Sequence, residues 1–150
     1  KIQNVAELRA LLRRLWFDFY PRSGNSTVLD TSGFEHVMVG EYKSVEKASG
    51  LHNWLAFYEK EKKTEEPNIN YYGYTCGIEP HRMCAAYDWN GRKKRLSSFF
   101  LNVSPAFDLA IYTLCFVMRP GTCHVVVDGQ KMDLQTFSKD GHVATAFVHV

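Results

Sequence analysis

Two histidines and one lysine are the residues of this chain whose types best suit defined chemistry. His36 lies in a short apolar run with glutamates nearby, and His52 lies at the expected start of a helix. Lys94 belongs to the basic run 92–95. Imidazoles exchange protons near neutral pH, so two histidines in different surroundings can act as acid and base. An ammonium beside them can stabilise developing negative charge.

This set of groups matches the requirements of RNA cleavage by the RNA's own ribose. The 2′-OH attacks the adjacent phosphorus, so a base must remove its proton and an acid must protonate the leaving 5′ oxygen. A cation stabilises charge on the phosphorane. The sequence contains no HExxH zinc motif, no GxxxxGK[ST] phosphate loop and no GxSxG nucleophile motif. For each histidine a structural role is the alternative, and for run 92–95 the alternative is a solvated loop.

The first two elements must position His36. Asn4 and Glu7 form a capping box, and apolar residues at helical spacing predict a helix over 1–20. A polar loop follows, and then 34–42 is predicted to be a strand. Alternation along that strand would put Glu35 and Glu41 on the face opposite His36. The two glutamates could then hold a cation, orient backbone or lie in solvent.

A second helix is predicted over 51–60, with His52 in its first turn. The positive end of a helix disfavours imidazolium, so the pKa of His52 should be depressed. A neutral imidazole at this position would suit a general base.

From Asn68 onward the pattern changes to short runs rich in β-branched and aromatic residues, which predict six strands. Asn90-Gly91 and Asp128-Gly129 predict hairpin turns. One helix interrupts, with Ser104 as N-cap and Pro105 in the first turn, and its apolar residues predict burial nearly all round. Helices followed by mainly antiparallel strands predict an α+β fold in a single domain over 1–150.

Composition narrows the class further. Hydrophobic residues make up 45% of the 150 residues, enough for a core, and the net charge of +2 favours no partner class. No stretch approaches about 18 consecutive apolar residues, so no membrane span is expected. Four cysteines allow three disulfide pairings, and free buried thiols are the alternative. The sequon Asn25-Ser26-Thr27 and the cysteines favour the secretory pathway, with intracellular RNA processing as the alternative.

Five separate stretches, in order, resemble the EndoU family of endoribonucleases, which are related to placental protein 11 and, distantly, to the uridylate-specific endoribonucleases of nidoviruses. The stretches are SGFEHVMVGE (32–41), SGLHNW (49–54), DWNGRKK (88–94), SPAFDLAIYTLCFVMRPG (104–121) and ATAF (144–147). The resemblance implies a uridylate-preferring endoribonuclease that cleaves single-stranded RNA and leaves 2′,3′-cyclic phosphate ends. It also implies that the chain is the catalytic C-terminal part of a longer family domain.

The resemblance implies catalytic roles for His36 as acid, His52 as base and Lys94 as the cation. Lys93, one residue earlier, is the alternative position for the lysine. The basic residues beside Lys94 stand where the family commonly has apolar ones, which should strengthen phosphate contact.

Further positions follow from the same resemblance. Ser98, Thr145 and Phe147 match residues that bind the uridine, and Phe147 keeps the ring of the family's usual tyrosine without its hydroxyl. Glu35 and Glu41 match glutamates that support activity, in a structural or ion-related role. Stimulation by a divalent cation, Mn²⁺ or Ca²⁺, and a monomer that binds U-containing RNA are expected. The alternative function is an RNA-binding module with weak or lost catalysis, for which Phe147 is the best support.

Overall fold

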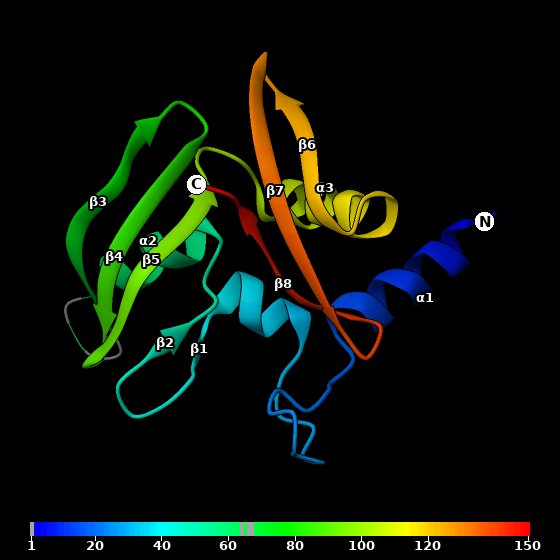
Figure 1. Cartoon of the computed structure of the whole chain (residues 1–150), viewed down its shortest axis with the longest axis horizontal. Coiled ribbons are helices and arrows are strands. Elements are labelled where there is room, and N and C mark those ends of the chain that lie inside the picture. Colours follow the sequence, from blue (N-terminus) through cyan, green and yellow to red (C-terminus); the bar gives the residue numbers. More distant parts are fainter. Residues whose placement is uncertain (1, 64, 66–67) are drawn as a thin grey trace.

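The computed structural model describes residues 2–63, 65 and 68–150 (Figure 1). Its three α-helices are α1 (Val5–Trp16), α2 (Trp54–Glu61) and α3 (Pro105–Met118), and a π-helical segment spans Glu35–Val39. The strands are β1 (Glu41–Tyr42), β2 (Ala48–Ser49), β3 (Ile69–Glu79), β4 (Arg82–Trp89), β5 (Arg92–Phe100), β6 (Gly121–Val127), β7 (Gln130–Lys139) and β8 (His142–Val148).

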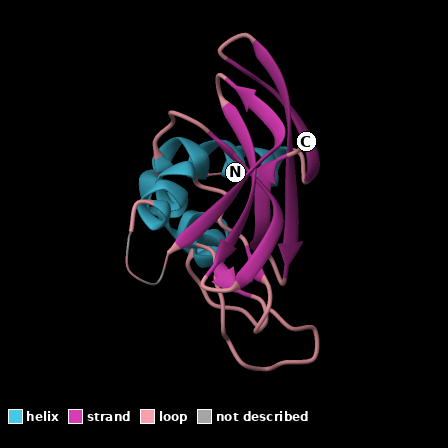
Figure 2. Ribbon diagram, turned by 90° about the vertical axis from the view of Figure 1, so that its left-hand side faces the viewer, coloured by secondary structure: helices cyan, strands magenta, loops and turns pink. Residues whose placement is uncertain are grey.

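Two antiparallel three-stranded sheets, β3-β4-β5 and β6-β7-β8, make up most of the fold, and β1 and β2 form a short ribbon. The helices lie mostly on one side of the strands (Figure 2). The predicted α+β class with antiparallel pairing is therefore confirmed, and so are the six strands after Asn68.

Each sheet has its own hydrophobic core. α1, the π-helical segment and α3 pack with the β6-β7-β8 sheet around Trp16, Tyr112 and Leu134, whereas α2 packs on the β3-β4-β5 sheet around Phe57 and Phe99. Burying a large apolar side chain contributes roughly 1.5–3 kcal/mol. The two cores meet where β5 lies against β8, and the site described below lies at this junction.

The cysteines form two disulfides, one in each half of the fold. Cys76 on β3 pairs with Cys84 on β4, and Cys115 on α3 pairs with Cys123 on β6. Of the three pairings that the sequence allows, the structure therefore selects the one in which each cysteine bonds the cysteine eight positions away.

The predicted strand over 34–42 is wrong. Residues 35–39 form the π-helical segment, and only Glu41 and Tyr42 are extended. Three consecutive residues, His36–Met38, are buried, and a strand with one buried face would bury only alternate ones. The apolar run EHVMV is too short for its periodicity to separate strand from helix.

The predicted helix ends also need correction. α1 has the predicted cap, since Asn4 Oδ1 accepts from the Glu7 amide, but it ends at Trp16 and the expected start at Lys1 lies outside the described residues. α2 begins at Trp54 rather than Leu51, because Leu51 has φ +60° and Asn53 caps the helix by accepting from the Ala56 amide.

The hairpin turns and the cap of α3 are as predicted. Asn90-Gly91 and Asp128-Gly129 both have positive φ at each residue, and Ser104 caps α3. Burial of α3 nearly all round is wrong: one face of the helix is exposed, at Leu114, Val117 and Met118.

Candidate active site

The π-helical segment places two backbone carbonyls where the loop before α2 can use them. The Gly40 amide donates to Glu35 O at 2.8 Å, one residue further than in an α-helix. The carbonyls of His36 and Val37 are thereby left free within the segment. They accept from the Leu51 and His52 amides at 2.9 and 2.6 Å. The backbone of one histidine is thus bonded to the loop that carries the other.

Gly50 permits this close approach. It has φ +67°, and a Cβ atom there would lie 1.9 Å from the His36 carbonyl oxygen. Any other residue must push the loop away from the π-helical segment, because backbone cannot yield as a flexible side chain can.

Replacing Gly50 with alanine should therefore destabilise the fold and lower RNA cleavage by at least tenfold. Gly129→Ala is the matched control, since Gly129 has φ +78° and no atom within 4 Å of its Cβ position. The control should cost only about 1 kcal/mol of conformational strain, which corresponds to a loss of about 2–4 °C in Tm for a chain of this size. Thermal melts and initial cleavage rates measure both effects. Equal losses in the two variants would contradict the steric explanation.

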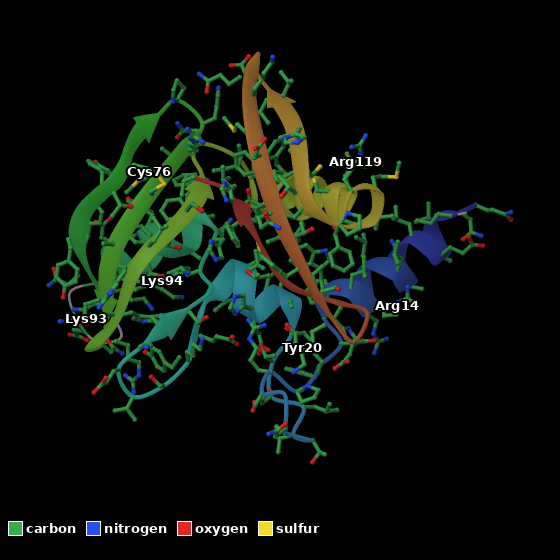
Figure 3. The ribbon with its side chains drawn as sticks, viewed as in Figure 1. Arg14, Tyr20, Cys76, Lys93, Lys94 and Arg119 are labelled. Atoms are coloured by element: carbon green, nitrogen blue, oxygen red, sulfur yellow. A yellow bond between two sulfur atoms is a disulfide. The ribbon has the colours of Figure 1, made fainter. Side chains whose placement is uncertain are left out.

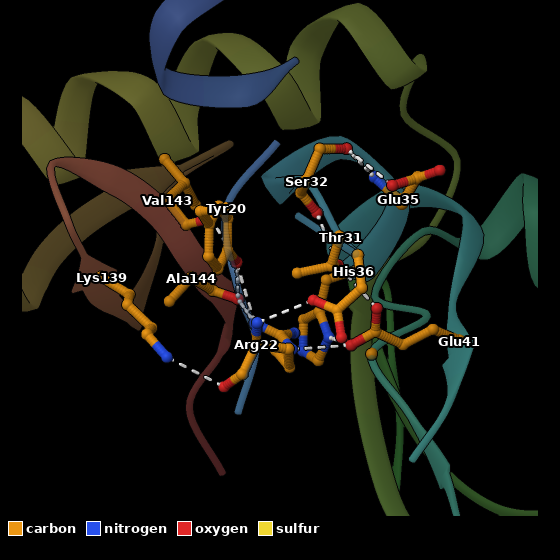
Figure 4. Close-up of polar contacts among 12 residues, drawn as sticks. Tyr20, Arg22, Thr31, Ser32, Glu35, His36, Glu41, Lys139, Val143 and Ala144 are labelled. Carbon is orange, nitrogen blue, oxygen red and sulfur yellow. Dashed lines mark hydrogen bonds and ion pairs between the residues drawn. The ribbon is translucent and has the colours of Figure 1, made fainter. Parts of the chain in front are cut away.

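His36 is held by a charged network (Figure 4). Its Nδ1 lies 2.6 Å from Glu41 Oε1, which also accepts from Arg22 Nε at 2.7 Å, while Thr31 Oγ1 donates to Glu41 Oε2 at 2.7 Å. A carboxylate only accepts, so Nδ1 carries a proton and Nε2 is the ring atom left for a substrate. The carboxylate lies where it can stabilise positive charge on the ring while a proton is transferred.

The prediction that both glutamates face away from His36 is therefore wrong for Glu41. The helical turn, unlike a strand, returns Glu41 to the side of the histidine. Glu35 does lie apart: its carboxylate accepts from Ser32 Oγ at 3.2 Å, and its amide donates back to the same hydroxyl oxygen. Glu41 thus positions the histidine, whereas Glu35 bonds Ser32 at the start of the turn.

His52 is buried in the loop just before α2. Its Nδ1 lies 2.9 Å from the carbonyl oxygen of Ser98, which can only accept. The neutral ring therefore carries its lone pair on Nε2. Burial lowers the pKa of His52 well below 6.5, and the charge of Lys94 lowers it further, while the bond to Ser98 opposes the shift. The predicted direction is confirmed, but burial, not the helix end, is the main cause.

Lys94 completes the group from β5 (Figure 3). Its Nζ lies 3.4 Å from His52 Nε2 and donates to the carbonyl oxygen of Gly50. Burial lowers the pKa of Lys94 from 10.5 to about 7. Because the ring centroids of His36 and His52 are 6.4 Å apart, the three predicted catalytic residues lie around one small volume.

These three side chains line a cavity of about 480 Å³, and residues of both three-stranded sheets complete its wall. Ser98 of β5 and Phe147 of β8 lie in its wall with the two histidines. The Phe147 ring stacks on His52, with centroids 5.2 Å apart and an interplanar angle of 24°. The Ser98 hydroxyl donates to the carbonyl of Val148, which leaves its lone pairs as acceptors.

Thr145 is the one predicted substrate residue that does not line this cavity. It lies two residues before Phe147 on β8 and lines a neighbouring cavity of about 340 Å³ with Arg22, His36 and Glu41. His36 and Ser49 border both cavities.

The two glutamates do not fit an inner-sphere divalent-ion site. Glu41 already accepts from three donors, and Glu35 is bonded to Ser32. Throughout the described part of the chain, no three His, Cys, Asp or Glu side chains are grouped so that they could hold a metal ion. Mn²⁺ and Ca²⁺ prefer several oxygen ligands, and these residues do not offer them.

Several supporting residues have no sequence signal that marks them. Arg22 and Thr31 hold Glu41 from a loop that reads as polar and unstructured, and Arg22 also donates to the carbonyl of Ala144 on β8. Asn53 caps α2 and donates to buried Asp108 of α3 at 2.7 Å, which anchors the loop of His52. Only Gly50, in the turn before His52, could have been singled out by its type.

No helix within the described residues has both the length and the apolar character that a membrane span requires.

Asn25, the asparagine of the sequon, has an exposed side chain.

Comparison with known proteins gives consistent matches. A family model described as endoribonuclease XendoU matches residues 1–148. A uridylate-specific endoribonuclease of Paralichthys olivaceus is 37% identical over 134 residues, which cover 86% of this chain and 33% of that protein. This chain thus spans about a third of the length of that relative.

Two solved structures are similar. The structure of XendoU, described as a splicing-independent snoRNA-processing endoribonuclease, superposes with a TM-score of 0.77 and 31% identity, over 98% of this chain and 56% of that chain. The endoribonuclease Nsp15 of Middle East respiratory syndrome coronavirus gives a TM-score of 0.61 at 17% identity, over 77% of this chain and 33% of that chain. The second match is evidence for the fold alone.

Proposed function

This chain belongs to the endoribonuclease XendoU family, and from that premise we propose that it is a uridylate-preferring endoribonuclease that cleaves single-stranded RNA. The observation that carries the proposal is the convergence of His36, His52 and Lys94 on one cavity from three separate segments. The uridylate preference is supported by the relatives, which are uridylate-specific endoribonucleases, and by the aromatic wall of the cavity.

In the proposed reaction His52 Nε2 removes the proton of the ribose 2′-OH, whose oxygen attacks the adjacent phosphorus. His36 Nε2 donates its proton to the leaving 5′ oxygen, so the products are a 2′,3′-cyclic phosphate and a free 5′-OH. The assignment is supported by the two environments: His52 is buried and neutral, whereas His36 bonds a carboxylate. Acid and base groups of this kind each contribute roughly 10²–10⁴-fold.

Lys94 supplies positive charge to the phosphorane oxygens. Its ammonium is poorly solvated, so its interaction with a phosphate is stronger than it would be in water. A bound phosphate would in turn stabilise the ammonium and raise its pKa.

Uridine recognition is proposed for Ser98 and Phe147. With its hydrogen donated to Val148 O, the Ser98 hydroxyl can accept from N3–H of uracil, a donor that cytosine lacks. The Phe147 ring offers a stacking surface for the base. Thr145, in the adjoining cavity, would contact the ribose or a flanking phosphate.

We further propose that Mn²⁺ or Ca²⁺ stimulates the reaction by acting on the RNA, because the glutamates present no ion site. The protein is proposed to act as a monomer. It is also proposed to act in the secretory pathway, and the two disulfides support that location.

The deciding experiment uses a single-stranded oligonucleotide with one uridine, with EDTA or Mn²⁺ present. Cleavage 3′ of the uridine should leave a cyclic phosphate, detected by mass spectrometry. The same oligonucleotide with 2′-deoxyuridine should remain intact but bind equally. Cutting of the deoxy substrate would overturn the mechanism, and binding without any cleavage would support the RNA-binding module instead.

A further inference from the structure

A third cavity, of about 650 Å³, lies between the β1–β2 ribbon and the beginning of β5. It adjoins the catalytic cavity, which is the 480 Å³ cavity lined by His36, His52 and Lys94. We call it the basic groove. Its charged lining residues are Lys43, Glu46, Lys47, Lys93, Lys94 and Arg95.

The backbone builds this groove. The Lys93 amide donates to the carbonyl of Glu46 at 2.9 Å, and Lys47 forms a parallel bridge with Lys93. These contacts dock the ribbon on the edge of β5, where the two lie side by side (Figure 1). Lysines from segments almost fifty residues apart are thereby brought to one surface.

The charge of the groove is uncompensated. Four exposed cations, Lys43, Lys47, Lys93 and Arg95, face one carboxylate, that of Glu46. Within the described ranges none of these four cations forms an ion pair. A concave surface with an excess of one charge attracts a polyion of the opposite charge.

The alternative is a solvent-exposed strand edge with no binding role, which would also expose lysines. Such an edge would not be expected to join the catalytic cavity. Ser49 and Lys94 line both the basic groove and the catalytic cavity. The groove therefore starts at the lysine assigned to the scissile phosphate.

The order of residues along β5 gives the direction. Ser98, the proposed uracil contact, lies toward one end of the strand, Lys94 follows at the phosphate, and Lys93 lies beyond it in the groove. An RNA chain with its uridine at Ser98 and its phosphate at Lys94 continues past Lys94 on the 3′ side. We propose that the basic groove binds the backbone phosphates of nucleotides on the 3′ side of the cleaved bond. The proposal rests on the proposed function.

The test compares Lys47→Ala/Lys93→Ala with the control Arg119→Ala/Lys131→Ala, which removes the same charge from exposed positions outside the groove. Figure 3 shows Arg119 on the opposite side of the molecule from Lys93. The substrates are the dinucleotide UpA, UpA extended by five nucleotides on its 3′ side, and UpA extended by five nucleotides on its 5′ side.

The groove variant should lose about tenfold in kcat/KM on the 3′-extended substrate and less than about twofold on the other two. Binding of the 3′-extended RNA, measured in a His52→Ala background, should show a salt dependence whose slope is smaller by about 1.4, or about 0.7 per lost contact. The control variant should match the parent protein throughout.

Equal losses on the 5′-extended substrate, or no loss on the 3′-extended one, would overturn the proposal while leaving the proposed function intact. Failure of the parent protein to cleave any of the three would instead overturn the proposed function. In that case the salt slopes still decide whether the groove binds RNA. Thermal melts verify that both double variants are folded.

Discussion

Replacing His52 with alanine should lower kcat/KM on a uridine-containing oligonucleotide by about 10²–10⁴-fold. The loss follows from the removal of Nε2, the proposed base, which keeps its lone pair because Nδ1 donates to the carbonyl oxygen of Ser98. Because burial holds the pKa of His52 well below 6.5, the base is already neutral at that pH. The acidic limb of the kcat/KM profile should therefore lie below pH 6.5.

His124→Ala is the matched control, since His124 is exposed on β6 and pairs only with Asp133 among the described residues. His124→Ala should cleave RNA at the rate of the parent protein.

Added imidazole should enter the space left by His52 and restore part of the activity of His52→Ala. This variant should still bind RNA. An unchanged rate in His52→Ala would show that the base lies elsewhere.

Replacing Lys94 with methionine should have opposite effects on activity and stability. Cleavage should fall by about 10²–10³-fold, because a charge-stabilising group is lost from the transition state. Tm should rise, because methionine fills similar space without placing an ammonium in a poorly solvated position.

The gain in stability should depend on pH in a defined direction. The pKa of Lys94 is about 7 in the folded protein and 10.5 in its ordinary environment, so the folded state binds this proton less well. The penalty is absent above about pH 10.5, grows as the pH falls and is complete below about pH 7. The difference in Tm between variant and parent should thus be larger at pH 6 than at pH 10. A difference that does not change with pH would contradict a depressed pKa for Lys94.

Local patterns were sufficient where the physical cause is local. The caps at Asn4 and Ser104, and the hairpin turns at Asn90-Gly91 and Asp128-Gly129, were predicted because hydrogen bonds and positive φ values depend on neighbouring residues. The strand-rich C-terminal part was predicted for the same reason. The apolar stripe of α3 predicted the helix but not how much of it is buried, since burial depends on which other elements pack against the helix.

The residues of the site could be named from their types and motifs, but the contacts between them could not be predicted. A strand at 34–42 would have separated Glu41 from His36, and the π-helical turn joins them. The turn depends on residues that are distant in sequence. Gly50 packs against the carbonyl group of His36, and the Leu51 amide donates a hydrogen bond to that carbonyl oxygen.

The sequence by itself determined the acid, base and cation candidates and the family resemblance. It also determined the order of the elements, with helices in the N-terminal part and mainly strands after them. Only the tertiary structure decided that His36, His52 and Lys94 share a cavity, that burial depresses the pKa of His52, and that Arg22 and Thr31 hold Glu41. The physical reason is that desolvation and hydrogen bonding between distant segments arise only when the two cores meet. The same docking of β1–β2 on β5 assembles the basic groove beside Lys94.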